Sequence, residues 1–121
     1  MIVYLAGPMS GWVDFNVPVF DAVAELLRNN GHTVFNPADN GRGEPPREWD
    51  WYMRRGLGQL VLAEVIALLP YWFDSRGARF ERSVGDALGL RSDEAHRFLR
   101  ADQRRAYYAA VGTMSRVTEQ P

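Results

Sequence analysis

The apolar residues of this chain fall into two kinds of segment, short continuous runs and sets repeated at helical spacing. The runs at residues 2–6 and 65–69 are almost entirely apolar and contain β-branched side chains, which is typical of buried strands in a parallel sheet. A shorter run at residues 33–35 ends at Asn36-Pro37 and predicts a further strand. The pattern therefore predicts three strands before residue 70.

Between these runs the apolar residues recur at helical spacing. The first set ends at Gly31 and consists of Phe20, Val23, Ala24 and Leu27. The second consists of Trp49, Met53, Leu57 and Leu60, and a third helix is predicted from Ala78 to Leu88. Residues 38–46 hold three charged residues, two glycines and two prolines, which predict a surface loop. Strands that alternate with helices predict an α/β domain built on a parallel sheet with right-handed crossovers.

The segment after Leu90 is predicted to be helical. Ser92 is a suitable N-cap for a helix from Asp93 to Ala110, and no strand is predicted there. The expected buried positions of this helix are Ala95, Phe98, Leu99 and Tyr107. The chain is thus expected to form one domain over residues 1–90 with a C-terminal helical extension at 91–121, and a sheet of three to five strands. So short a sheet leaves surface for a second subunit, and a homodimer or higher homo-oligomer is expected.

Composition narrows the functional classes. The 121 residues suffice for one domain, and the chain has neither an apolar run long enough to span a membrane nor a signal-peptide pattern, so a cytoplasmic protein is expected. There is no cysteine, which excludes disulfides and cysteine nucleophiles. All 14 basic residues are arginine, which excludes a Schiff-base or P-loop lysine. The net charge of −1 gives no reason to expect nucleic acid as a partner, and two isolated histidines predict neither a metal site nor a cofactor.

Two loops have the character of a nucleotide site. Ser75 and Gly77 open the third predicted helix, where free backbone N–H groups favour an anion, and Glu81 follows one and a half turns later. Residues 6–11, Ala-Gly-Pro-Met-Ser-Gly, form a second such loop after the first strand. Both loops follow strands of the predicted sheet, and ligands bind at the carboxyl ends of parallel strands. A small-molecule site is therefore expected where the two loops meet.

Several segments together resemble the small phage-associated relatives of nucleoside 2-deoxyribosyltransferases. The segments are residues 2–11, Phe15-Asn16, residues 31–37, residues 69–72 and residues 75–81. The resemblance covers roughly residues 1–90 and implies a flavodoxin-like (Rossmann-like) fold. It also implies an enzyme that cleaves or transfers at the N-glycosidic bond of a 2′-deoxynucleoside or its 5′-monophosphate.

The resemblance further implies roles for individual residues. Glu81 would attack C1′ of the deoxyribose, and Tyr4 would orient its carboxylate through the phenol hydroxyl. Ser75 and Gly77 would hold a 5′-phosphate. The opposite side of the pocket would be lined by Gly7, Pro8, Met9, Ser10, Gly11 and Asn16.

Two positions depart from the pattern of these relatives. The second predicted helix has Gly56 where they usually carry an aspartate that passes a proton to the leaving base, a contribution of roughly 10²–10⁴-fold in rate. Glu64 replaces an aspartate before the third strand, a milder change. Asp74, just before Ser75, is the residue predicted to supply the missing acid, because Asp50 lies on another side of the helix from position 56.

Other interpretations remain open at this point. Glu81 could be a surface glutamate favoured by the helix dipole, and Tyr4 a core aromatic. Because glycine cannot transfer a proton, the chain could be a non-catalytic protein that binds or sequesters a nucleotide. A structural or protein-binding module is a third possibility, since the segment from Arg91 holds six arginines against four acids.

Overall fold

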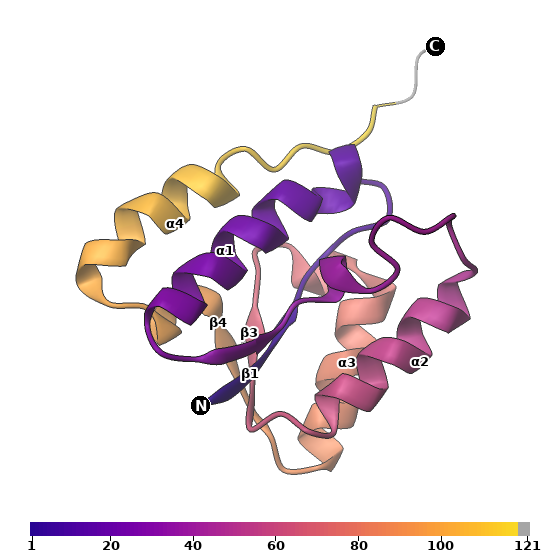
Figure 1. Cartoon of the computed structure of the whole chain (residues 1–121), viewed down its shortest axis with the longest axis horizontal. Coiled ribbons are helices and arrows are strands. Elements are labelled where there is room, and N and C mark those ends of the chain that lie inside the picture. The colour runs from indigo at the N-terminus through magenta and orange to yellow at the C-terminus, as the bar shows by residue number, and fades with distance from the viewer. Residues whose placement is uncertain (119–121) are drawn as a thin grey trace.

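The computed structural model describes residues 1–118 and has a parallel sheet of four strands between two layers of helices (Figure 1). The strands are β1 (Ile2–Ala6), β2 (Thr33–Phe35), β3 (Val65–Leu68) and β4 (Arg91–Glu94), and their order in the sheet is β2-β1-β3-β4. The four main helices are α1 (Val17–Asn29), α2 (Trp49–Leu60), α3 (Arg76–Ala87) and α4 (Arg104–Val111). The predicted α/β fold with a C-terminal helix is confirmed.

The alternation of side chains along β1 assigns the helices to the two faces of the sheet. Val3 and Leu5 lie in a core with the apolar residues of α1 and with Tyr107 of α4. Tyr4 and Ala6 point to the other face and lie in a second core with residues of α2 and α3. The side chain of Tyr4 is therefore brought to α2 and α3 by the pleat of its strand.

The strand order places the carboxyl ends of β1 and β3 side by side at the point where the order reverses. The connection from β1 leads to β2 on one side, and that from β3 leads to β4 on the other. The chain after β1 passes very close to the end of β3, since a Cβ on Gly7 would lie only 2.8 Å from Cβ of Leu69. Glycine is required there by this approach.

The prediction for residues 91–110 is wrong in its secondary structure. Residues 91–94 form β4, paired with β3 from Val65↔Arg91 to Leu68↔Glu94, and two 3-10 turns precede α4. The sequence of β4, Arg-Ser-Asp-Glu, has no apolar residue because its side chains are exposed or half-buried at the sheet edge. The expected buried positions are nevertheless buried: Ala95, Phe98, Leu99 and Tyr107. The apolar pattern thus predicted which side chains contact the core but not the secondary structure to which they belong.

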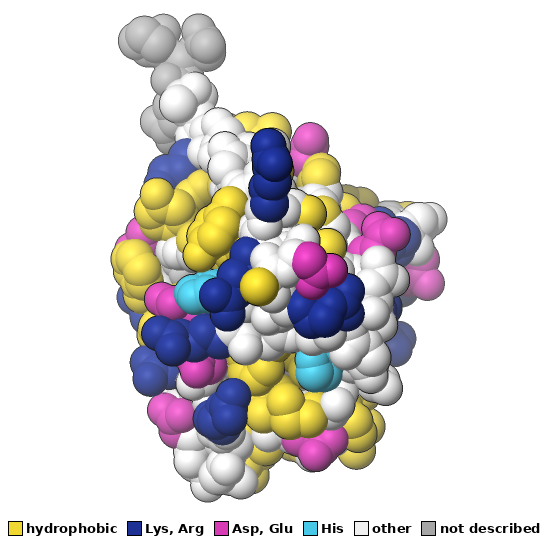
Figure 2. All heavy atoms as spheres, turned by 90° about the vertical axis from the view of Figure 1, so that its left-hand side faces the viewer, with side chains coloured by type: hydrophobic (Ala, Val, Ile, Leu, Met, Phe, Trp, Pro, Cys, Tyr) yellow, Lys and Arg dark blue, Asp and Glu magenta, His cyan; other side chains and the backbone are white. Residues whose placement is uncertain are grey.

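The face of the molecule around α4 carries mixed charges. Figure 2 shows arginine and acidic side chains interspersed with apolar ones on this side. Some of the C-terminal arginines pair with nearby acids, as in Arg97–Asp93 and Arg100–Asp102 at 3.2 and 3.0 Å. Within residues 1–118, no helix combines the length and the apolarity that crossing a bilayer demands.

Candidate active site

Tyr4 and Glu81 form a buried hydrogen-bonded pair between β1 and α3. Ala78, Glu81 and Gly85 are the buried positions of α3, spaced so that all three face the sheet. Tyr4 is fully buried and Glu81 is 7% exposed. The hydroxyl of Tyr4 donates a hydrogen bond to Oε2 of Glu81. The structure therefore brings together the two residues predicted to form the catalytic pair.

Burial sets the protonation behaviour of this pair. It raises the pKa of Glu81 to about 7, and the hydrogen bond from Tyr4 opposes that rise only in part. Burial and the neighbouring carboxylate hold the pKa of Tyr4 well above its ordinary value, so the phenol stays a donor. Within residues 1–118, the buried side-chain atoms without a hydrogen-bond partner are Nε of Arg82 and Oγ of Ser92. Oε1, the other carboxylate oxygen of Glu81, is not one of them. A carboxylate that gains and loses its proton near neutral pH is suited to nucleophilic or acid–base chemistry.

The backbone of α2 lies directly against the pair at Gly56. A Cβ built on Gly56 would lie 2.6 Å from Oη of Tyr4 and 3.1 Å from Oε2 of Glu81. Any side chain at this position would therefore displace the Tyr4–Glu81 pair, and the phenol ring is rigid and fully buried. The position at which the resemblance places an aspartate is thus adjacent to Glu81, but this packing leaves no room for one. The resemblance marked Gly56 as a position where the relatives' acid is missing, but it did not reveal this close approach.

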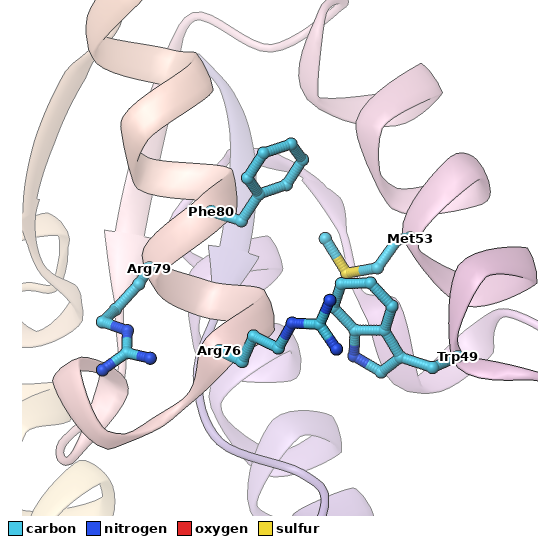
Figure 3. A pocket seen from close by; sticks show the side chains of 5 residues that line it. All are labelled: Trp49, Met53, Arg76, Arg79 and Phe80. Atoms are coloured by element: carbon cyan, nitrogen blue, oxygen red, sulfur yellow. The ribbon is translucent and has the colours of Figure 1, made fainter.

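The first turn of α3 adjoins a groove of about 450 Å³ between α2 and α3 (Figure 3). Ser75 is the N-cap, and its hydroxyl accepts a hydrogen bond from N–H of Ala78 at 3.2 Å. Gly77 lies under Met53, whose Sδ would be 3.3 Å from a Cβ there. The guanidinium of Arg76 reaches across the groove and lies 4.0 Å from the ring centroid of Trp49.

The groove and the buried pair are about one helical turn apart. Met53 contacts Gly77, and Gly56 contacts Glu81 further along the same two helices. Among residues 1–118, neither Arg76 nor Arg79 has an acidic group within ion-pair distance. Both arginines line the groove, and Figure 3 shows the guanidinium of Arg76 directed toward Trp49. A cationic and aromatic groove at a helix N-terminus favours an anionic, planar ligand.

The loop after β1 is held by its own hydrogen bonds. Asn16 is buried, and its Nδ2 donates to the carbonyl of Pro8 at 2.7 Å. Pro8 is buried, Met9 is half-buried and Ser10 is exposed. Asn16 therefore shapes the loop, whereas Ser10 is accessible to a ligand.

Asp74 and Glu64 are both engaged by other groups. Oδ2 of Asp74 accepts a hydrogen bond from Nη2 of Arg116 at 2.7 Å, so its role as a proton donor stays a prediction. Glu64 accepts from the backbone N–H of Ile2 at 2.9 Å, which ties the start of β1 to the residue before β3. Within residues 1–118, no three His, Asp or Glu side chains gather closely enough to hold a metal ion.

The sequence over residues 1–92 matches a family described as a domain of unknown function, DUF4406. The chain belongs to the DUF4406 family. The match ends within β4, so the rest of this DUF4406 chain, including α4, lies outside it. No curated protein matches the chain.

Among solved structures, the DUF4406 chain is similar to that of the 2-deoxyribosyltransferase from the psychrotolerant bacterium Bacillus psychrosaccharolyticus. The TM-score is 0.60 at 22% sequence identity, over 76% of this chain and 69% of the other. The two proteins therefore share a fold, in agreement with the flavodoxin-like arrangement expected from the sequence.

Proposed function

We propose that this DUF4406 protein cleaves or transfers at the N-glycosidic bond of a 2′-deoxynucleoside or, preferentially, its 5′-monophosphate. The observation that carries the proposal is the buried Tyr4–Glu81 pair, in which Glu81 has a pKa of about 7 and lies one turn from an arginine-bearing groove. The fold shared with a 2-deoxyribosyltransferase supports the class of substrate.

In the proposed reaction Glu81 acts as the nucleophile. Its ionised carboxylate bonds to C1′ while the C1′–N bond breaks, and the electron pair of that bond leaves with the base, which takes up a proton. Water or a second base then attacks C1′ and releases the carboxylate. Tyr4 orients the attacking oxygen through its hydroxyl. A negative carboxylate beneath C1′ stabilises the oxocarbenium-like transition state.

The groove is proposed to bind the phosphate. Ser75 and Gly77 provide the N-terminal turn of α3, and Arg76 lies at the same turn without an acidic partner among residues 1–118. A phosphate there would draw Arg76 from the face of Trp49. The loop of Gly7 to Gly11 is proposed to line the other side.

A second function, non-catalytic binding of a nucleotide, is favoured by one observation. Gly56 provides no acid for the leaving base, and the packing against Tyr4 and Glu81 leaves no room for one. A protein of this kind would keep the groove and bind the nucleotide without turnover. Assembly as a homodimer stays a prediction for either function, and gel filtration tests it.

The test is the release of free base from a panel of 2′-deoxynucleosides and their 5′-monophosphates, followed by liquid chromatography. Glu81→Gln keeps the shape and the hydrogen bond to Tyr4 but removes the nucleophile. Glu25→Gln removes the same charge from an exposed position of α1 and serves as the control. We expect release by the wild type and by Glu25→Gln but not by Glu81→Gln. Equal release by Glu81→Gln would exclude Glu81 as nucleophile, whereas binding measured by calorimetry without any release would favour the nucleotide-binding function.

A further inference from the structure

The segment after α4 returns to the loop that follows β1 (Figure 1). We call residues 113–117 the C-terminal strap. The N–H of Val13 donates to the carbonyl of Ser115 at 2.8 Å, and the N–H of Val117 donates to the carbonyl of Gly11 at 2.9 Å. Trp12 and Arg116 form an antiparallel bridge between these two bonds. The strap is therefore hydrogen-bonded to one of the two loops beside the candidate site.

The side chain of Arg116 reaches the other loop, the one that follows β3. It forms the 2.7 Å ion pair with Asp74. Its guanidinium also lies 4.6 Å from the ring of Trp12 and 5.7 Å from that of Tyr71, and these two rings are 5.3 Å apart. Arg116 thus contacts both loops at once. It contacts the loop after β3 through the ion pair with Asp74 and the ring of Tyr71, and the loop after β1 through the ring of Trp12.

Both loops hold non-glycine residues in the left-handed backbone conformation. In the loop after β1 they are Asp14, Phe15 and Asn16, with φ of 53°, 53° and 57°, and in the loop after β3 it is Tyr71, with φ of 64°. Such conformations carry an energetic cost and persist where surrounding contacts hold them. The contacts of Arg116 are of this kind, because they fix Tyr71 directly and the first loop through Trp12.

We propose that Arg116 is a positioning residue of the candidate active site, which joins the two loops and holds them in the shape that binds substrate. The inference rests on the proposed function. Arg116 lies outside the family match at residues 1–92, so this role belongs to the chain's own C-terminal segment. Because Arg116 acts on the loops and has no contact with Glu81 among those described, its loss should weaken substrate binding and spare the attack of Glu81 on C1′.

The effect of Arg116 on the two loops is tested first, by hydrogen exchange of the full-length protein without ligand. Arg116→Ala should speed exchange at residues 11–16 and 71–75 by about tenfold, the effect of one exposed ion pair plus two cation–π contacts, and leave β1 and β3 unchanged. Asp74→Asn should loosen the loop after β3, and the double variant should add little to Arg116→Ala. Arg105→Ala, at an exposed position of α4, is the control and should change neither loop. Unchanged exchange in both Arg116→Ala and Asp74→Asn would overturn the proposal.

Steady-state kinetics on a deoxynucleoside 5′-monophosphate then separate positioning from a general loss of structure. Arg116→Ala should raise KM about tenfold with kcat within about twofold, and Arg116→Lys, which keeps the charge, should recover part of the loss. Looser loops with an unchanged KM would overturn the role in substrate binding. If the wild type neither turns over nor binds the nucleotide, the proposed function fails, and the exchange experiment still decides whether Arg116 joins the loops.

Discussion

Replacing Glu81 by glutamine should change the pH dependence of stability. Glu81 is almost fully buried, and burial raises the pKa of its carboxyl from 4.5 to about 7. The folded state therefore binds this proton more tightly than the unfolded state does. The stabilisation from proton binding is fully present below about pH 4.5 and is lost as the pH rises through about 7. Glutamine has no such proton and still accepts the hydrogen bond from Tyr4.

The magnitude follows from the size of the pKa shift. A shift from 4.5 to about 7 corresponds to roughly 3 kcal/mol, since one pKa unit is about 1.4 kcal/mol. Relative to the wild type, the free energy of unfolding of Glu81→Gln should rise by only about 1 kcal/mol between pH 4 and 5 and by about 3 kcal/mol by pH 8. The gain appears because the wild type must bury an ionised carboxylate at high pH.

The measurement is urea unfolding followed by circular dichroism at pH 5, 6, 7 and 8 for the wild type, Glu81→Gln and Glu25→Gln. Comparison within each pH cancels the titration of all other groups. A difference between wild type and Glu81→Gln that stays constant from pH 5 to 8 would refute the reasoning, because Glu81 would then have an ordinary pKa. The exposed control should show no such trend.

Two further outcomes are expected from the same site. Gly56→Ala should destabilise the protein by about 1–3 kcal/mol, because the new Cβ meets Tyr4 and Glu81, whereas Gly58→Ala, with nothing within 4 Å, should stabilise α2 by up to about 1 kcal/mol. Urea unfolding compares the stabilities of the two variants. Similar free energies of unfolding would mean that α2 is not closely packed against Tyr4 and Glu81 at Gly56. Tyr4→Phe removes a hydrogen bond that lowers the pKa of Glu81, so the pH at which kcat/KM is half-maximal should move upward. A pH–rate profile measures this shift, and a midpoint that stays in place would show that the phenol does not tune the carboxylate.

Much of the fold could be predicted because buried strands and amphipathic helices have distinct apolar patterns. β1, β2 and β3 were located by their apolar runs, and Ser75 caps α3 as its position before the helix suggests. β4 could not be found in this way. Its four polar residues lie at the edge of the sheet, where pairing with β3 and not a side-chain pattern makes them a strand.

The parts of the site that depend on the type and position of a single residue could be predicted from the sequence. The parts that depend on packing between distant segments could not. Glu81 and Tyr4 were identified from the resemblance, and the structure brings them together. Gly56 and Gly58 look equivalent in the sequence of α2, yet only Gly56 faces the buried pair. The contact of Arg116 with Asp74 joins segments far apart in the chain, and no local pattern reports such a contact.

The antiparallel bridge between Trp12 and Arg116 has a consequence for the order of folding. Contacts between distant segments require the closure of a long loop, and the entropy of that closure favours early formation of more local structure. Since β1, β3 and β4 pair without the C-terminal strap, the sheet and its helices can assemble before the strap docks. The shape of the two loops would then be acquired last and lost first. A protein with a frayed C-terminal segment would keep its secondary structure and its core, while under the proposed function its affinity for a nucleotide had already declined.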